Sequence, residues 1–206
     1  MKKYIVNMIV TVSVLLLVLL LIFIRDNISN ILIIKTINSI ALSLGIIFFM
    51  YIFLSCIYIM YSIKRDNKNA LKYIKRKGFE DLEEESLKQI KKYIFFRQIL
   101  NSKYNLLIAY FALGKNDKAF TLLNETKWGF YKRYTLSYKV FELLYYENVE
   151  DARKIYCKLC RLNKTHDDNL EILGFIFDYI DNNIKNDKMK RTIYPIVNLI
   201  CEKYGK

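Results

Sequence analysis

The sequence predicts an all-α protein in which two transmembrane helices are followed by an α-solenoid of antiparallel helix pairs. Three observations indicate this architecture. Two long runs near the N-terminus carry no charged residue. The rest of the 206-residue chain repeats its apolar residues at intervals of three and four, which is the period of a helix. It contains no alternating strand-like segment, and its one proline is Pro195.

The two uncharged runs cover residues 5–24 and 36–63. A helix needs roughly 20 apolar residues to cross a bilayer core, so each run is long enough for one crossing. Two buried core helices are the alternative, but a domain of this size cannot cover two helices that are apolar on every side. A cleaved signal peptide is disfavoured because no small-residue cleavage site follows the first run. We therefore expect a transmembrane hairpin over residues 1–63.

Basic residues predict the orientation of this hairpin. Lys2 and Lys3 precede the first run and a dense basic segment follows the second, whereas only two basic residues separate the runs. Because cytoplasmic flanks collect Lys and Arg, we expect a plasma-membrane protein with both termini in the cytoplasm. Ala41 and Gly45 suit close packing of helices, which leaves self-association of the hairpin open. No ionisable side chain lies inside either run, so the hairpin is predicted to be an anchor and not a transport pathway.

Residues 64–79 form a basic juxtamembrane segment. Anionic lipid attracts such a segment by about 1 kcal/mol per basic residue near the surface, and a topology signal alone is the alternative. The predicted lipid-surface residues are Lys64, Arg65, Lys68, Lys72, Lys75, Arg76 and Lys77. The formal net charge of +13 also raises the question of nucleic-acid binding. No nucleic-acid-binding motif is present and the other basic residues are interleaved with acidic ones, so we do not expect it.

Helical periodicity predicts seven helices in the remaining region, residues 80–206, which we expect in the cytoplasm. They are predicted near residues 80–97, 101–113, 117–127, 133–146, 150–162, 168–183 and 191–204. The first has an acidic start and a basic end, which complement the helix dipole. Short connections between helices favour antiparallel pairs.

Two of these pairs match when one is laid over the other. Tyr110 and Ala119 correspond to Leu143 and Ala152, each 33 residues later, and the next step, from Leu143 to Phe177, is 34. A helix-turn-helix unit with this period, and with a small residue at the start of its second helix, resembles the tetratricopeptide repeat. A generic helical bundle with accidental spacing is the alternative.

The resemblance covers residues 101–204 in three units of unequal quality. The first matches at Leu106, Leu107, Tyr110, Gly114, Ala119 and Leu123, and the second at Leu136, Val140, Leu143, Ala152 and Tyr156. The third begins with Leu170, Leu173, Gly174 and Phe177. It then has Asn186 and Lys190 where the family has alanine and an aromatic residue. Lys103 and Lys139 also stand at positions that the family keeps apolar.

The resemblance implies a concave groove lined by the first helix of each pair. Its predicted lining residues are Tyr104, Asn105, Ile108, Phe111, Tyr134, Tyr138, Phe141 and Tyr145. Tyrosine, of which the chain has 17, gives a large contact area for little entropy, so the groove is predicted to bind a protein partner. The family's binding of a terminal carboxylate is not expected, because Tyr104 and Ile108 replace the lysine and asparagine that it needs. Packing between helices is the alternative role of each tyrosine.

Cysteine and histidine offer a weak metal site. Cys157 and Cys160 form a C-x-x-C, and His166 and Cys201 follow, a set that could in principle bind zinc. The pair lies in an apolar helical run where cysteine commonly acts as a small buried hydrophobe, so we expect no metal. The absence of a βαβ pattern around the pair argues against redox chemistry.

No sequence motif suggests catalysis. The chain contains no phosphate-binding, dinucleotide-binding, hydrolase or zinc-protease motif, so we expect no cofactor and no enzymatic activity. Its Ile-, Lys- and Asn-rich composition is typical of an AT-rich bacterium. The predicted function is a membrane-anchored scaffold or adaptor that binds a protein partner. The alternative is a membrane-surface regulatory protein that acts through its basic segment and anionic lipid.

Overall fold

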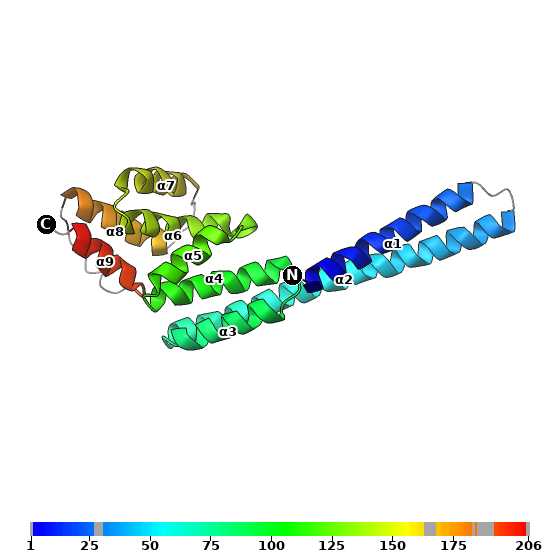
Figure 1. The fold of residues 1–206 in the computed structure, drawn as a ribbon, viewed down its shortest axis with the longest axis horizontal. Coiled ribbons are helices and arrows are strands. Elements are labelled where there is room, and N and C mark those ends of the chain that lie inside the picture. Colours follow the sequence, from blue (N-terminus) through cyan, green and yellow to red (C-terminus); the bar gives the residue numbers. More distant parts are fainter. Residues whose placement is uncertain (1, 27–30, 163–167, 183, 185–191, 205–206) are drawn as a thin grey trace. The chain divides into compact units, whose positions relative to one another are not determined.

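The computed structural model describes residues 2–26, 31–162, 168–182, 184 and 192–204 (Figure 1). These residues form helices joined by short connections, with no strand among them, which confirms the predicted all-α class. The helices are α1 (Lys2–Asp26), α2 (Ile31–Lys75), α3 (Phe79–Lys92), α4 (Phe96–Ala112), α5 (Asn116–Glu125), the 3-10 helix η1 (Gly129–Tyr131), α6 (Lys132–Tyr145), α7 (Val149–Leu162), α8 (Asp168–Asn182) and α9 (Pro195–Tyr204). The chain divides into two compact units, residues 1–68 with 92–99 and residues 69–91 with 100–206.

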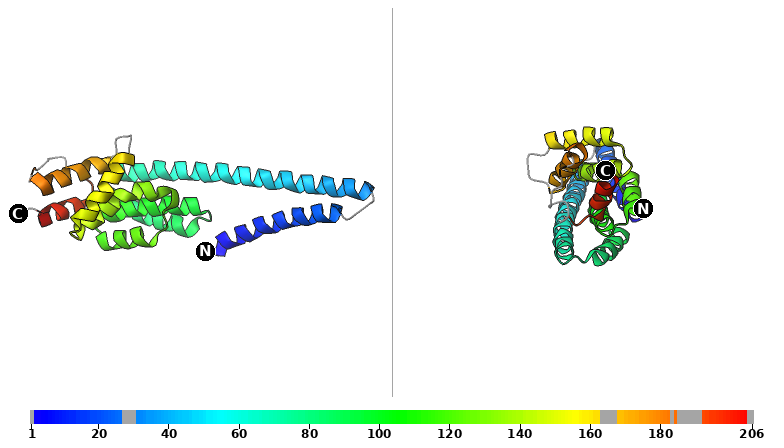
Figure 2. Two further views of the ribbon diagram at one scale, coloured as in Figure 1. Left: turned by 90° about the horizontal axis from the view of Figure 1, so that it is seen from above. Right: turned by 90° about the vertical axis from the view of Figure 1, so that its left-hand side faces the viewer.

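The first unit contains α1 and the apolar part of α2, which run in opposite directions (Figures 1 and 2). By length and apolar composition, α2 is the one helix in the described part of the chain that qualifies as a membrane span, and none of its apolar window is buried inside the protein. The described apolar stretch of α1, Val12–Arg25, is shorter than a span requires. One candidate span is thus found where the sequence predicts two.

α2 does not end at Ile63, where the second predicted span ends, but continues to Lys75. Residues 64–75 contain neither glycine nor proline, so no helix-breaking residue interrupts the helix. Ser62, Asp66 and Ala70 are at most 5% exposed, and they recur every four residues along one stripe of α2. The helix therefore extends beyond the predicted span, and most of the basic segment is the last part of α2 itself.

The predicted helix over residues 80–97 consists of two elements, since α3 ends at Lys92 and α4 begins at Phe96. Apolar residues continue through the connection, so the helical period alone does not show the turn. The start of α9 also differs from its prediction near residue 191. This helix begins at Pro195, because proline lacks the N–H that the first helical position leaves unpaired. The helices α5 to α8 begin and end within two residues of their predictions.

α6 is central to the second unit and packs against α5, α7, α8 and α9. Val140, Phe141 and Leu144 of α6 are fully buried. Ala119 in α5 and Ala152 in α7, the small residues that the sequence places at close helix contacts, are also fully buried. A larger side chain at either alanine would overpack the core and force neighbouring helices apart.

Three helices, α2, α4 and α6, end in the same left-handed turn. The turn residues are Lys77, Gly114 and Glu147, with φ angles of 56°, 68° and 62°. Glycine adopts this conformation without cost, whereas a side chain with a Cβ is strained in it. The three turns lie 37 and 33 residues apart along the chain. The sequence predicted the interval of 33 residues, but it predicted no repeat unit at the end of α2.

Hydrogen bonds show that the three turns are equivalent. The amide after each left-handed residue donates to a carbonyl five residues earlier, an arrangement known as the Schellman motif. These bonds run from Gly78 to Tyr73 at 2.9 Å, from Lys115 to Tyr110 at 2.8 Å and from Asn148 to Leu143 at 2.9 Å. A further backbone hydrogen bond follows each turn. It runs from the amide of Leu82 to the carbonyl of Gly78 at 3.1 Å, from Ala119 to Lys115 at 3.0 Å and from Ala152 to Asn148 at 3.1 Å. Each turn therefore joins two consecutive helices in the same way.

Candidate functional site

The structure separates the eight residues predicted to line a groove. Four of them, Asn105, Phe111, Tyr138 and Phe141, are at most 5% exposed. The ring of Phe111 in α4 stacks on that of Tyr138 in α6, with centroids 5.0 Å apart. The expectation that a partner can reach these four residues is therefore wrong for this structure. They hold helices together, which is the alternative role that the sequence left open.

The C-terminal part of the chain covers the same surface. α9 packs against α6 and α8, and α8 and α9 lie side by side in both views (Figures 1 and 2). The hydroxyl of Tyr194, just before α9, lies 2.9 Å from that of Tyr138, and its ring centroid lies 6.3 Å from that of Phe111. Burial, and secondarily the neighbouring Tyr194, hold the pKa of Tyr138 well above its ordinary value. Tyr138 is thus a neutral core residue beneath the chain's own C-terminal segment.

Two of the predicted groove residues meet at the surface in an aromatic cluster, which we define as Tyr104, Tyr131 and Tyr134. The ring centroid of Tyr104 lies 5.7 Å from that of Tyr131 and 6.3 Å from that of Tyr134, and the last two are 6.2 Å apart. Tyr134 is 57% exposed, and the other two are half-buried. The cluster therefore presents aromatic surface from α4, η1 and α6 at one place.

Sequence reasoning missed Tyr131, the third member of the cluster. It lies in η1, outside the predicted helix over residues 133–146, and its hydroxyl donates to Asn101 Oδ1 at 2.8 Å. Its spacing of three and seven residues before Tyr134 and Tyr138 is the signal that could have placed it on the same helical face. The hydrogen bond to α4 fixes the ring beside Tyr104.

Tyr145 and Ile108, the other predicted groove residues, lie elsewhere in the second unit. Tyr145 is half-buried at the end of α6, where its ring centroid is 5.4 Å from that of Phe120 and 5.3 Å from that of Tyr146. The Lys203 ammonium lies 4.7 Å above the ring of Tyr145 and donates to its carbonyl oxygen at 2.6 Å. Ile108 is half-buried against both apolar cores of this unit. Neither residue belongs to the aromatic cluster.

Basic side chains accompany the aromatic cluster. Lys132 and Arg133 precede Tyr134 and are exposed, and the Arg133 guanidinium donates to the Leu162 carbonyl at 2.6 Å. The ammonium of Lys103, next to Tyr104 in the chain, donates to Thr126 Oγ1 at 3.1 Å. The surface around the aromatic rings is therefore suited to a ligand that carries negative charge.

The predicted lipid-surface residues are all exposed. On α2 they occupy faces other than the buried stripe of Ser62, Asp66 and Ala70, and we call them the basic stripe. Arg76 pairs with Asp81 at 2.9 Å, and its guanidinium carbon lies 4.5 Å above the ring of Tyr73. Exposed pairs of this kind contribute about 0–1 kcal/mol to stability. Five of its seven members, from Lys64 to Lys75, lie on α2 itself.

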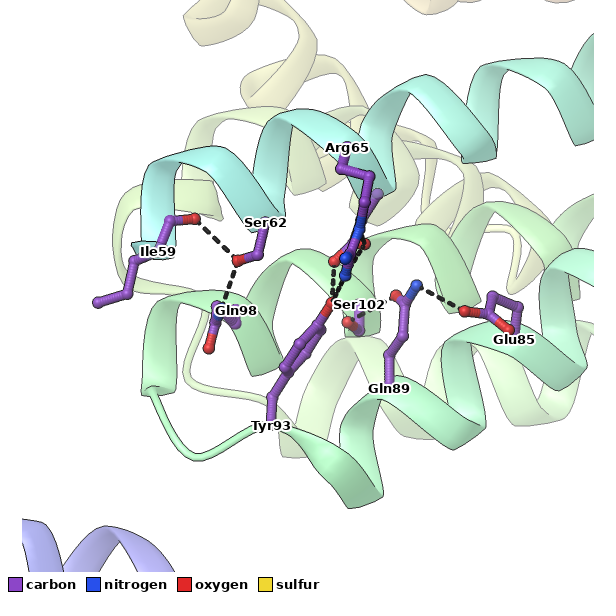
Figure 3. A network of polar contacts seen from close by, with 9 residues as sticks. Ile59, Ser62, Arg65, Glu85, Gln89, Tyr93, Gln98 and Ser102 are labelled. Atoms are coloured by element: carbon purple, nitrogen blue, oxygen red, sulfur yellow. Dashed lines mark hydrogen bonds and ion pairs between the residues drawn. The ribbon is translucent and has the colours of Figure 1, made fainter. Parts of the chain in front are cut away.

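A polar contact that the sequence did not predict holds the start of α4 to α2 (Figure 3). Gln98 donates to the Ser62 hydroxyl, and the Tyr93 hydroxyl donates to the carboxylate of the buried Asp66. Burial, and then the bond to Asp66, raise the pKa of Tyr93 to about 12. The neutral phenol is favoured in the folded state, so this contribution to stability is present below pH 10 and is lost as the pH rises through 12. A second group in the same view joins Ser102 to Gln89 at 3.0 Å and Gln89 to Glu85 at 3.1 Å.

The cysteines do not form a metal centre in the described part of the chain. Cys157 and Cys160 are both exposed on α7, so the expectation that they are buried hydrophobes is wrong. Cys201 is half-buried, and His166 lies outside the described residues. No three His, Cys, Asp or Glu side chains among the described residues are grouped closely enough to hold a metal ion.

No protein-family model, curated protein or solved structure matches this chain. Its function is therefore inferred from its own residues and their geometry.

Proposed function

We propose that the protein is a membrane-anchored scaffold or adaptor whose second unit, in the cytoplasm, binds a protein partner. The aromatic cluster of Tyr104, Tyr131 and Tyr134 carries this proposal. Aromatic side chains are enriched at protein interfaces because a large, rigid ring loses little entropy on binding. A cluster of three rings with one of them 57% exposed gives a partner a ready-made contact surface.

The anchor is formed by the transmembrane hairpin of α1 and α2. The apolar part of α2 supports it by its length, its composition and its exposure. Lys and Arg follow this part directly, and two lysines begin the chain, which favours a cytoplasmic location for both termini. The second unit then lies on the cytoplasmic side of a plasma membrane.

The repeated turns support an array of helix pairs related to the tetratricopeptide repeat. The same Schellman turn joins α2 to α3, α4 to α5 and α6 to α7. Recurrence of one turn with one pattern of buried positions is what a repeat of helix pairs requires. The first pair of this array uses the end of α2, so the anchor and the array share a helix.

The proposed partner carries an acidic and apolar segment. From Lys64 onward the chain has 29 basic and 19 acidic residues, and basic side chains flank the aromatic cluster. Opposite charge on the partner raises the rate of association and excludes basic competitors. No cofactor and no catalytic step form part of this function.

The experiment compares Tyr134→Ala with Tyr146→Ala in the full-length protein in its membrane. The two tyrosines are 57% and 59% exposed and lie at opposite ends of α6, so they are a matched pair. A photo-crosslinking residue at position 132 identifies the partner, whose affinity for each purified variant is then measured. Loss of a central aromatic contact weakens binding by about 2 kcal/mol, or roughly 30-fold. Equal affinities for the two variants would contradict the proposal.

A second candidate function is supported by the basic stripe, which attracts anionic lipid. α2 rises about 1.5 Å per residue, so Lys64 and Lys68 lie within about 8 Å of Ile63 and reach the headgroups of a bilayer that ends near this residue. A membrane-surface regulator would depend on Lys64 and Lys68 and would be insensitive to Tyr134→Ala.

A further inference from the structure

The connection between α3 and α4 has an apolar tip flanked by cations, and we call residues 93–97 the α3–α4 turn. Ile94 and Phe95 are half-buried, and Phe96 is 52% exposed. Lys92 before the turn and Arg97 at its end are both exposed. No aromatic partner is recorded for Phe96 among the described residues, so the fold itself does not account for the exposed ring.

Hydrogen bonds hold both ends of the turn at the end of the apolar part of α2. Gln98 donates to the hydroxyl of Ser62, which directly precedes Ile63, the last residue of the uncharged run. Tyr93 donates to Asp66, about 4.5 Å beyond Ile63 along the helix. Figure 3 shows Tyr93 and Gln98 directed at α2 on either side of this level. The tip between them is thus held beside the point where the uncharged run gives way to Lys64 and Arg65.

We propose that the α3–α4 turn is a second membrane-binding element, which inserts Phe95 and Phe96 into the interface of an anionic phospholipid bilayer. This inference rests on the proposed anchor. Amphipathic and aromatic side chains collect at the level of the headgroups, where Tyr58 and Tyr61 of α2 also lie. Lys92 and Arg97 are placed to meet lipid phosphates, as are Lys64 and Arg65 on α2.

Contact of the turn with lipid restricts the motion of α2. A spanning helix can rotate about its axis and tilt, whereas interfacial aromatic and basic side chains oppose both motions. The bonds from Tyr93 and Gln98 attach the turn to one face of α2, so lipid contact favours one rotation of this helix. The side chains on that face, Ser62 and Asp66, are those least compatible with lipid, and the turn covers them.

The test places a tryptophan at the tip of the turn in the full-length protein. Phe96→Trp is reconstituted into vesicles of phosphatidylcholine and phosphatidylserine that contain lipids brominated near either end of the acyl chain. Trp128, the one natural tryptophan, is buried in the second unit, and its emission in the unchanged protein is the background. Phe49→Trp, within the uncharged run, and Tyr134→Trp, on the second unit, are the controls.

We expect the emission of Phe96→Trp to be blue-shifted from that of Tyr134→Trp and to be quenched most by bromine near the headgroup. If Phe49→Trp is quenched while Phe96→Trp is quenched no more than Tyr134→Trp, the anchor stands and the inference is overturned. A blue shift without quenching by bromine would place Phe96 against protein and also overturn it. If Phe49→Trp is not quenched either, the anchor itself fails.

Discussion

Three equivalent backbone positions carry three different residues, Lys77, Gly114 and Glu147. All three have positive φ angles and end a helix in a Schellman turn. Only glycine occupies this region without a steric penalty, which is about 1–2 kcal/mol for other residues. The two non-glycine turns are therefore strained at one residue each, and the packing of the following helices maintains them.

This equivalence predicts opposite effects from two substitutions. Gly114→Ala should lower the free energy of unfolding by about 1 kcal/mol, and Glu147→Gly should raise it by a similar amount. Glu147 also pairs with Lys203 at 3.5 Å, an exposed contact worth about 0–1 kcal/mol. Glu147→Ala removes this pair and keeps the strain, so it separates the two effects. Denaturant unfolding of the purified protein measures all three, and equal signs for the first two would contradict the equivalence.

Among the helices, α9 determines which aromatic residues of the second unit are exposed to water. It packs on α6 and α8, and Tyr194 at its start contacts the rings of Phe111, Tyr138 and Phe141. Without α9 these aromatic residues would face water, as the prediction of an open groove assumed. The helix therefore stabilises the unit by covering the surface that the sequence assigned to a partner.

A cavity substitution tests this role of α9. Tyr194→Ala removes a buried ring and should lower the free energy of unfolding by about 3–5 kcal/mol. Leu199→Ala on the same helix, where the side chain is 38% exposed, should cost less than about 1 kcal/mol. Hydrogen exchange should show faster exchange in α9 and in the facing part of α6 for the first variant. Similar losses for the two variants would indicate that α9 contributes little to the core.

α2 is the helix that the two units share. Its first part is apolar and exposed, and its last part packs Ala70, Tyr73 and Ile74 against α3 and α4. Neither glycine nor proline interrupts residues 64–75, so one helix carries residues of both units.

At the scale of the whole molecule, chemical labelling of the cysteines tests the predicted membrane topology. Cys56 lies in the apolar part of α2, and Cys157 and Cys160 are exposed on α7. In single-cysteine variants in intact cells, a membrane-impermeant maleimide should label none of them. After permeabilisation it should label Cys157 and Cys160, while Cys56 should react only in denaturing detergent, because a polar maleimide does not enter the hydrocarbon core that surrounds this thiol. Labelling of Cys157 in intact cells would place the second unit outside the cell.

Local signals in the sequence predicted much of the fold. The helical class, the bounds of α5 to α8 and the buried positions of Ala119 and Ala152 depend on the helical period and on residues close in the chain. The period of 33 residues between two helix pairs is likewise present in the sequence, because equivalent turns require similar neighbours. The exposed apolar part of α2 also follows from its composition.

The parts of the fold that the sequence did not predict depend on contacts between residues far apart in the chain. The connection between α3 and α4, which the helical pattern did not show, is held to α2 by Tyr93 and Gln98, 27 and 36 residues after their partners in the chain. Tyr194 packs on Tyr138, which lies 56 residues earlier in the chain, and so buries a surface that the sequence predicted to bind a partner. A periodic pattern shows which face of a helix is apolar but not which element covers it, because burial depends on pairings that no local window contains. The sequence by itself therefore determined the helical class, the bounds of α5 to α8 and the apolar N-terminal region, and the tertiary structure decided which aromatic residues remain at the surface.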